Sequence, residues 1–336
     1  MPVAEARVSV VIPTRNRIDL LPRTLGSVLA QRDVELEVIV VDEASTDGTA
    51  EYIQGLRDPR LTVIRHERPR GVAEARNAGL RAAKARWVAF LDDDDIWAPT
   101  KLADQLNALA ASPGARWSCV GAVTINPRLR VLIASHPPEG PWVAGELLPR
   151  NRIPGGGSGV VVDAELIRAL GGFDTQLSNL ADWDMWLRLS LVAPLAVVDA
   201  PLVGYLRHRR SLSHDASGMR RELDHINVKH ATTRTAWGLT DAGSFQQRWV
   251  ANMHVRAGRR VEPVRIYLRL ARRGDGRALV RAVLLGMWPP LIAVIDWHAR
   301  RRVPVGWRIE AEAWLAAHPH PHVVQRRPPL VAPRKE

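Results

Sequence analysis

Residues 87–97 read WVAFLDDDDIW, a run of five apolar residues followed directly by four aspartates. An uninterrupted apolar run of this length is typical of a strand buried on both faces of a parallel sheet. Four adjacent carboxylates repel one another and raise one another's pKa, so a folded site of this kind usually needs a cation. Carboxylate oxygens suit hard divalent ions such as Mg²⁺ or Mn²⁺. We therefore expect a metal-dependent polar site at the end of this strand. The alternative is an acidic turn that caps the helix expected from Pro99.

The residues before this strand alternate between strand and helix patterns. Strands are expected at 7–12, 36–41 and 61–64, and helices at 18–31, 49–56 and 72–84. Such alternation predicts βαβ units and a parallel sheet, in which ligands bind beyond the carboxyl ends of the strands. Pro13-Thr14-Arg15, Asp42-Glu43 and the aspartate run follow three of these strands, so we expect them at one edge of the sheet.

The residues after the aspartates form a less regular pattern. We expect helices at 99–111 and 182–191, extended segments at 116–125, 129–134, 160–162 and 195–206, and a flexible glycine-rich loop at 153–159. Beyond residue 215 the pattern is helical, and the Pro- and Arg-rich tail from residue 319 is expected to be disordered. These patterns predict an α/β domain at 1–214, a helical region at 215–318 and a tail at 319–336.

Composition excludes several classes of protein. The 336 residues, 46% hydrophobic and 24% charged, are enough to bury a core, and the single cysteine, Cys119, excludes a disulfide scaffold. No basic segment followed by an apolar segment begins the chain, so we expect no signal peptide. The longest apolar run, 282–295, is too short to span a membrane and contains Pro289-Pro290. A cytoplasmic protein is expected, with peripheral contact at the inner face of the membrane as an open alternative.

The formal charge of +12 is unevenly distributed along the chain. Residues 1–199 hold 22 basic and 25 acidic residues, whereas residues 200–336 hold 25 and 10. An anionic partner of the C-terminal part would explain this asymmetry, and a solvated Arg-rich helical face explains it equally well.

Five segments, in order, carry a resemblance to a known family. They are VSVVIPTRNR (8–17), VVDEASTDGT (40–49), GVAEARNAG (71–79), FLDDDDIW (90–97), and GGFD (171–174) with ADWDMWLRL (181–189). Together they resemble family 2 glycosyltransferases over residues 7–210. The resemblance implies an α/β protein of the GT-A (Rossmann-like) fold, with a mostly parallel sheet flanked by helices. The mainly helical C-terminal extension lies outside the resemblance.

The resemblance also implies a reaction and a donor site. The reaction is inverting transfer of a sugar from a nucleotide-diphosphate donor, for which a UDP-sugar is favoured, to a hydroxyl acceptor of unknown nature. A divalent ion, Mn²⁺ or Mg²⁺, would be held by Asp92 or Asp93 together with Asp94, and His208 would lie beside it or the diphosphate. The nucleotide sugar would contact Pro13, Thr14, Arg15, Asp42, Glu43, Arg76, Asp92 and Asp93. The family more often has Asp-Asp at positions 42–43, so Glu43 leaves the nucleobase open.

By the same resemblance, Asp182 is the general base that takes the proton of the acceptor hydroxyl. Asp184 is its rival, although on a helix it would point elsewhere. The family usually has Glu-Asp at 181–182, whereas Ala181 stands here. Trp183 and Trp186 are as well explained by core packing as by stacking on a sugar.

Two alternatives to an enzyme are open. One is a non-catalytic sugar-nucleotide or glycan-binding protein on the same fold, which Ala181 favours and Asp182 disfavours. The other is nucleic-acid binding through the basic C-terminal part, for which the sequence has no signature. Its helices are expected to pack on the catalytic domain and to shape the acceptor site, a homodimer contact or a membrane contact.

Overall fold

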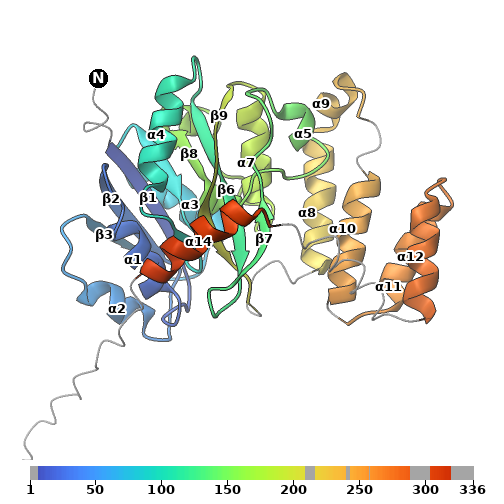
Figure 1. Cartoon of the computed structure of the whole chain (residues 1–336), viewed down its shortest axis with the longest axis horizontal. Coiled ribbons are helices and arrows are strands. Elements are labelled where there is room, and N and C mark those ends of the chain that lie inside the picture. Colours follow the sequence, from blue (N-terminus) through green and yellow to red (C-terminus); the bar gives the residue numbers. More distant parts are fainter. Residues whose placement is uncertain (1–6, 209–215, 240–242, 257, 288–302, 319–336) are drawn as a thin grey trace, which may run out of the picture.

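The computed structural model describes residues 7–208, 216–239, 243–256, 258–287 and 303–318 (Figure 1). The expected tail at 319–336, the Pro289-Pro290 pair and the boundary at 214/215 lie outside these residues.

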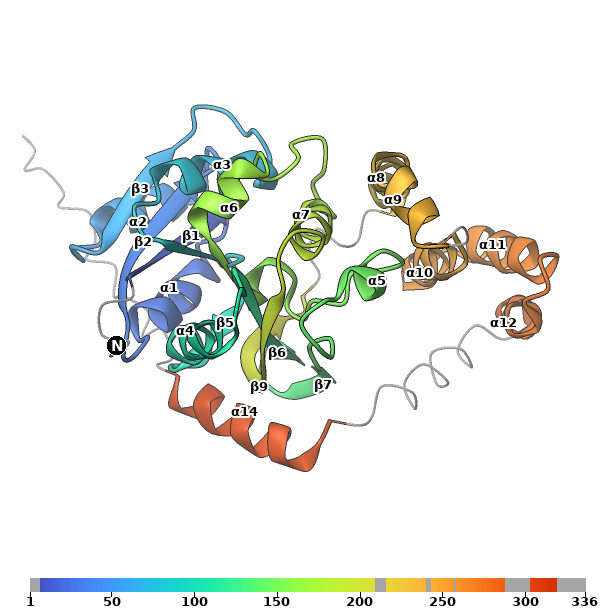
Figure 2. The ribbon, with the colours of Figure 1, turned by 90° about the horizontal axis from the view of Figure 1, so that it is seen from above.

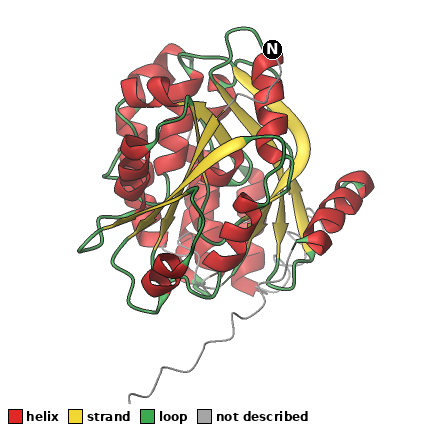
Figure 3. Cartoon of the chain, turned by 90° about the vertical axis from the view of Figure 1, so that its left-hand side faces the viewer, coloured by secondary structure: helices red, strands yellow, loops and turns green. Residues whose placement is uncertain are grey.

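A mixed sheet of nine strands is the centre of the described part (Figure 3). The strands are β1 (Arg7–Thr14), β2 (Glu35–Asp42), β3 (Leu61–Arg65), β4 (Trp87–Phe90), β5 (Ile96–Trp97), β6 (Trp117–Ile125), β7 (Val131–Ser135), β8 (Val160–Asp163) and β9 (Leu195–Leu206). Their order is β3-β2-β1-β4-β8-β6-β9-β5, and β7 pairs with β6. The first four strands are parallel. β8 then pairs antiparallel with both β4 and β6, so the second half of the sheet is mixed.

Helices cover both faces of this sheet (Figure 2). One face carries α3 (Val72–Ala82), α6 (Ala164–Ala169) and α7 (Ala181–Ser190), and the other carries α1 (Leu21–Leu29), α2 (Thr49–Gly55), α4 (Lys101–Ala111) and α14 (Val305–Ala317). The short helix α5 (Ala144–Leu147) packs against α7. Alternate residues of one strand serve the two layers, because successive side chains of a strand point to opposite faces. Val11 belongs to the α3 layer, whereas Val10 and Ile12 belong to the α1 layer.

The C-terminal part leaves the sheet and returns to it. α8 (Ala216–Lys229) and α9 (Ala231–Ala236) lie beside α7, and α10 (Gly243–Arg256), α11 (Val261–Ala271) and α12 (Gly276–Met287) extend away from the sheet (Figures 1 and 2). α14 then packs back on the sheet. The indole of Trp307 rests on Gly121 of β6, where a Cβ would lie 2.2 Å from the ring. Trp314 Nε1 donates a hydrogen bond of 3.0 Å to Pro201 O in β9.

The structure confirms the expected α/β fold and adds details that the patterns did not predict. The expected flexible loop at 153–159 contains a 3-10 helix, η2 (Gly156–Gly159). Ser158 in this turn is fully buried, its carbonyl accepts from Trp97 Nε1, and its hydroxyl donates to Asp95. These contacts from distant segments hold the turn, so local glycine content was a poor guide to order. Within the described ranges, no helix is long and apolar enough to cross a membrane.

Close packing of α3 on β1 depends on Gly79. A Cβ at this position would lie 2.2 Å from Val11 Cγ1, and Val11 is fully buried. We expect Gly79→Ala to lower the free energy of unfolding by about 1–3 kcal/mol, because overpacking forces side chains off their rotamers. Urea unfolding followed by circular dichroism measures the change.

Gly55 provides the matched control, because a Cβ there would meet nothing within 4 Å. Gly55→Ala at the end of α2 should be neutral or stabilise by about 0.5–1 kcal/mol. The double variant Gly79→Ala with Val11→Ala should lose less stability than the sum of the losses of the two single variants, because the two residues are in contact. Equal stabilities of the Gly79 and Gly55 variants would contradict this account of the contact.

Candidate active site

The first two carboxylates of the aspartate run are paired with arginines from other segments. Arg76 of α3 donates from Nη2 to Asp92 Oδ1 at 2.5 Å. Burial opposes the charge of Arg76, but the carboxylates of Asp92 and Asp182 raise its pKa above the ordinary value. Asp93 accepts from Arg17 Nε and from the backbone N–H of Arg15, both at 3.3 Å. Burial and the charge of Asp94 raise the pKa of Asp93 to about 7, against the opposing charge of Arg17.

The last two carboxylates are held by the end of β9 and by η2. Asp94 Oδ2 lies 2.8 Å from His208 Nε2, just beyond β9. Asp95 is fully buried; it accepts from Ser158 Oγ at 2.6 Å and from the backbone N–H of Leu206 at 2.9 Å. Asp95 is therefore a structural residue that fixes the aspartate run to both segments, which separates it from the three carboxylates before it.

A cavity of about 520 Å³ opens over this end of the sheet. The predicted site residues that line it are Pro13, Thr14, Arg15, Glu43, Arg76, Asp92, Asp93, Asp94 and Asp182. Of the described residues, Asp42 and His208 do not line it, although each touches a segment that does. The C-terminal helices contribute Met219 of α8 and Trp249 of α10 to the same wall. Nine predicted residues from five segments of the chain thus meet around one cavity.

Glu43 and Asp42 have separate partners. The Glu43 carboxylate accepts from the backbone N–H groups of Arg70 and Gly71 at 2.6 and 2.7 Å, and it contacts His66 Nδ1. It therefore shapes the loop that precedes α3 at the cavity rim. Asp42 is buried, accepts from the Ser45 N–H at 3.1 Å and pairs with an arginine of β3 at 3.6 Å.

Asp182 lies in the first turn of α7 and lines the same cavity. It accepts from the Trp183 N–H at 2.7 Å and from Asn151 Nδ2 at 3.3 Å. Burial raises the pKa of Asp182 to about 6, although the charge of Arg76 opposes the shift. This carboxyl can therefore accept a proton near neutral pH, as a general base must.

The glycine turn η2 separates Asp182 from the Arg76–Asp92 pair. A Cβ on Gly156 would lie 3.1 Å from Asp182 Oδ2, and Gly156 has a φ of 54°. A Cβ on Gly157 would lie 2.9 Å from Arg76 Nη2. Only residues without side chains let the two acidic groups approach from either side of this turn.

The N-terminal end of α7 is held by α8. The Glu222 carboxylate accepts from the backbone N–H groups of Asn179 and Leu180 at 2.8 and 2.9 Å, and from Asn179 Nδ2 at 3.0 Å. Glu222 therefore satisfies backbone donors at the start of the helix that carries Asp182, where a negative charge is also favoured by the helix dipole. Asn179 and Leu180 line the cavity.

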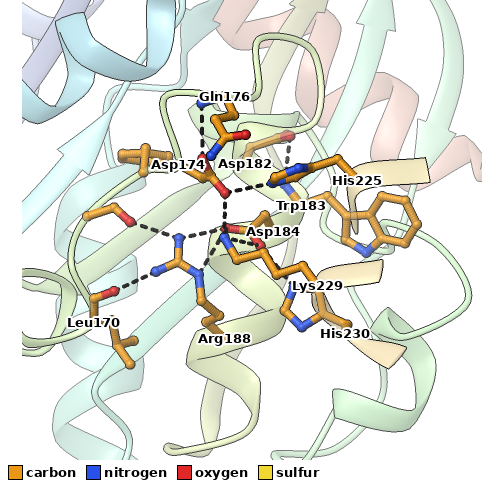
Figure 4. A network of polar contacts seen from close by, with 12 residues as sticks. Leu170, Asp174, Gln176, Asp182, Trp183, Asp184, Arg188, His225, Lys229 and His230 are labelled. Carbon is orange, nitrogen blue, oxygen red and sulfur yellow. Dashed lines mark hydrogen bonds and ion pairs between the residues drawn. The ribbon is translucent and has the colours of Figure 1, made fainter. Parts of the chain in front are cut away.

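A second ion-pair network joins α7 to α8 below the cavity (Figure 4). The fully buried Asp184 pairs with Arg188 at 2.7 Å, with Lys229 at 3.0 Å and with His230 at 2.9 Å. Burial alone would raise the pKa of Asp184, but the hydrogen bond from His230 and the two cations hold it below the ordinary value. Asp184 thus points away from the cavity into a structural network, as its spacing from Asp182 on a helix predicts.

Two of the residues expected to bind a metal ion, Asp94 and His208, are in contact. Within the part of the chain that the structure describes, no group of three or more His, Cys, Asp or Glu side chains is arranged to hold a metal ion. Asp94 and His208 nevertheless offer a carboxylate oxygen and an imidazole nitrogen 2.8 Å apart, and the Asp92 carboxylate lines the same cavity. Mg²⁺ typically takes one or two carboxylates and completes its shell with substrate phosphates and water. This small donor set fits an ion that a diphosphate helps to bind.

Comparison with known proteins places this geometry in a family. A model of the family described as "Glycosyl transferase family 2" matches residues 9–133. An uncharacterized glycosyltransferase of Haemophilus influenzae is 31% identical over 231 residues, which make up 67% of this chain and 77% of that protein. The chain belongs to glycosyltransferase family 2. Three other curated relatives match over 95 to 101 residues, between 27% and 40% of their own lengths, and a putative colanic acid biosynthesis glycosyl transferase of Escherichia coli matches over 213 residues, 73% of its length.

Solved structures confirm the GT-A-like fold of this glycosyltransferase. The mannosyltransferase PcManGT from Pyrobaculum calidifontis, solved with GDP-Man and Mn²⁺, has a TM-score of 0.57 and 21% identity, covering 95% of this chain and 89% of its own. TarS 1–349 of S. aureus, solved with UDP, has a TM-score of 0.52 and 19% identity, covering 93% and 92%.

The motifs of this family 2 enzyme did not reveal every residue at the cavity. Asn151, Tyr205, Met219, Trp249 and the Asn179–Glu222 pair lie outside the motifs that carry the resemblance. The amphipathic helix beyond residue 215 was predicted, but periodicity alone does not say which helix its polar residues will cap.

Asp184 offers a test of the α7–α8 junction. Asp184→Asn leaves nearby buried or half-buried cations without their counter-charge, so we expect a loss of about 3 kcal/mol in the free energy of unfolding. Because the folded-state pKa of Asp184 is lowered, its stabilisation is present above the unfolded value and fades as pH falls. The difference between wild type and variant should therefore shrink below about pH 4. Urea unfolding at several pH values measures it.

The control is a second Asp–His pair. Asp199 lies 3.0 Å from His136, but their side chains are 63% and 46% exposed. Asp199→Asn should change stability by less than about 0.5 kcal/mol, because exposed pairs contribute little. If the two variants lost the same stability, burial of the Asp184 network would not be what matters.

Proposed function

We propose that this glycosyltransferase moves a sugar from a nucleotide-diphosphate donor to an acceptor hydroxyl, with inversion at the anomeric carbon. The observation that carries the proposal is one cavity lined by two chemically different groups. One is the acidic run with its arginines, and the other is Asp182, whose pKa is raised to about 6.

The donor would lie over the ends of β1 and β4. Thr14 and Arg15 would lie beneath the nucleoside, and the loop that Glu43 shapes before α3 would form its rim. GDP-Man and UDP in the two neighbouring structures support a nucleotide sugar as the ligand class. A UDP-sugar remains our first choice of donor.

A divalent ion would be held by Asp94 and His208, with the Asp92 carboxylate beside them. When bound, such an ion supplies positive charge that neutralises the departing diphosphate. Mn²⁺ in the PcManGT complex supports this assignment. Arg76 and Arg17 keep the neighbouring carboxylates oriented toward the cavity and offset their repulsion.

Asp182 would act as the general base. The acceptor hydroxyl gives its proton to the Asp182 carboxylate while its oxygen forms a bond to the anomeric carbon. The bond from that carbon to the diphosphate breaks, and the diphosphate leaves with the electron pair. A single displacement of this kind inverts the anomeric centre. Arg76, close to both Asp92 and Asp182, keeps Asp182 ionised despite its burial.

The acceptor would enter beside the C-terminal helices. Met219 and Trp249 give the far wall of the cavity an apolar surface, and Asn151 and Asn179 give it amide groups. We propose that the division at residues 214/215 separates a donor-binding catalytic unit from helices that select the acceptor.

Nucleotide binding tests the donor side. UDP or GDP with Mn²⁺ should raise the melting temperature, because a ligand that binds only the folded state stabilises it. Asp94→Asn and His208→Ala should remove the part of the rise that depends on the metal, while Asp199→Asn should keep it. A rise of the same size with and without Mn²⁺, unchanged in Asp94→Asn, would rule out the proposed ion site.

The pH dependence of slow donor hydrolysis, which needs no acceptor, tests Asp182. The rate should fall about tenfold per pH unit below about 6, because only the ionised carboxylate can accept a proton. Asp182→Asn should lower the rate by roughly 10²–10⁴-fold and abolish this pH dependence. The same variant should keep the melting-temperature rise with nucleotide. An Asp182→Asn enzyme of normal activity would refute the assignment of the base.

A further inference from the structure

Helix α12 is apolar on two opposite faces. Ala278, Ala282 and Leu285 are buried against the rest of the protein, whereas Leu279, Val280 and Val283 are 49%, 58% and 49% exposed. The exposed three recur at the i, i+1, i+4 positions of one helical face. A second apolar face on one helix normally has a partner of its own. α12 packs against α11, and in Figure 1 it lies at the right-hand edge of the C-terminal helices.

The residues around this stripe are strongly basic. Residues 258–287 contain eight arginines and two acidic residues. Both acidic groups have arginine partners, since Glu262 pairs with Arg265 at 3.1 Å and Asp275 pairs with Arg248 of α10. Arg272, Arg273 and Arg277 are exposed in the turn between α11 and α12 and at the start of α12. We call these three arginines, together with Leu279, Val280 and Val283, the hairpin face.

The charge of the hairpin face indicates which kind of partner binds it. A second copy of the chain docked on the same face would bring arginines against arginines, which disfavours association. Nucleic acid would explain the arginines but not the three exposed aliphatic side chains. An anionic bilayer surface satisfies both, because interfacial helices insert apolar side chains at the acyl boundary and place arginines among the headgroups. The sequence after α12 continues this composition, with WPPLIAVI at 288–295 and three arginines at 300–302.

We propose that the hairpin face docks the enzyme on an anionic lipid surface. Leu279, Val280 and Val283 would enter the headgroup boundary, and Arg272, Arg273 and Arg277 would contact lipid phosphates. The inference is independent of the proposed transfer reaction, because docking needs neither sugar nucleotide nor metal.

Co-sedimentation of the full chain with vesicles tests the proposal. The probe is phosphatidylcholine containing about 30% phosphatidylglycerol, compared with phosphatidylcholine alone, at about 50 and about 500 mM salt. We expect binding to the anionic vesicles only, and weaker binding at high salt. Replacing the three arginines by glutamine should weaken binding on the order of 100-fold, because each contributes roughly fivefold near such a surface. Leu279→Ser with Val280→Ser and Val283→Ser should weaken it at least about tenfold.

α14 supplies the matched control. Val305 and Ile309 are 75% and 64% exposed on one face of that helix, where Glu312 balances the single arginine, Arg308. Val305→Ser with Ile309→Ser should therefore leave vesicle binding unchanged within about twofold. Melting temperatures with and without nucleotide show that each variant is folded and that its donor side is intact.

Several results would overturn the proposal. One is the absence of binding to anionic vesicles at low salt, and another is binding that neither triple variant weakens. A dimer in sedimentation velocity that the serine variant dissociates would identify a second copy as the occupant. A serine variant that loses several degrees of melting temperature without lipid would identify a covering segment of the chain itself. Binding to a DNA duplex as tight as to vesicles, and indifferent to the serine changes, would assign the face to nucleic acid.

Discussion

Mutual repulsion among four adjacent carboxylates is the constraint around which this molecule is arranged. A chain that places four aspartates after a buried strand has to give each of them a different partner. Here the partners come from four segments: the β1–α1 loop, α3, the end of β9 and η2. Because those segments also carry Arg15, Arg76 and His208 of the predicted donor and metal site, the pairs that offset the repulsion also bring these residues together. The pairs are Asp92–Arg76, Asp93–Arg17, Asp94–His208 and Asp95–Ser158.

The position of Asp182 at the cavity depends on a different set of charged residues. Asp182 lies in the first turn of α7, and α8 holds that turn in place. Glu222 of α8 binds the start of α7, and the Asp184 network joins the two helices further along. Ala181, where the resemblance leads us to expect an acid, is fully buried. A carboxylate from outside the helix, Glu222 of α8, binds the backbone N–H groups at the start of α7 instead. The position of Asp182 is thus supported by the C-terminal region, whereas the aspartate run is held by segments before residue 209.

Local patterns predicted the elements well where the pattern and the tertiary environment agree. β1 to β4 and the helices between them follow directly from buried apolar runs and helical spacing. Because the carboxyl ends of parallel strands meet at one edge of a sheet, the sequence also predicted that Thr14, Glu43 and Asp92 lie close together, and all three line one cavity. Prediction from sequence failed where distant contacts decide. The glycine-rich segment at 156–159 is held by hydrogen bonds from distant residues, among them those of Trp97 and Asp95 with Ser158. Glu222 could not be assigned to the start of α7, because no periodicity encodes which helix another helix will meet.

The return of α14 to the sheet has a consequence for how this chain can vary. Trp307 on Gly121 and Trp314 against β9 close the catalytic layer after the chain has already left it at residue 208. The helices from 216 to 287 therefore form an insertion between β9 and α14, two elements that pack together. Lengthening such an excursion costs little entropy, since loop closure grows only slowly with length. A change in the length of this insertion would therefore leave the contacts of α14 with β6 and β9 in place.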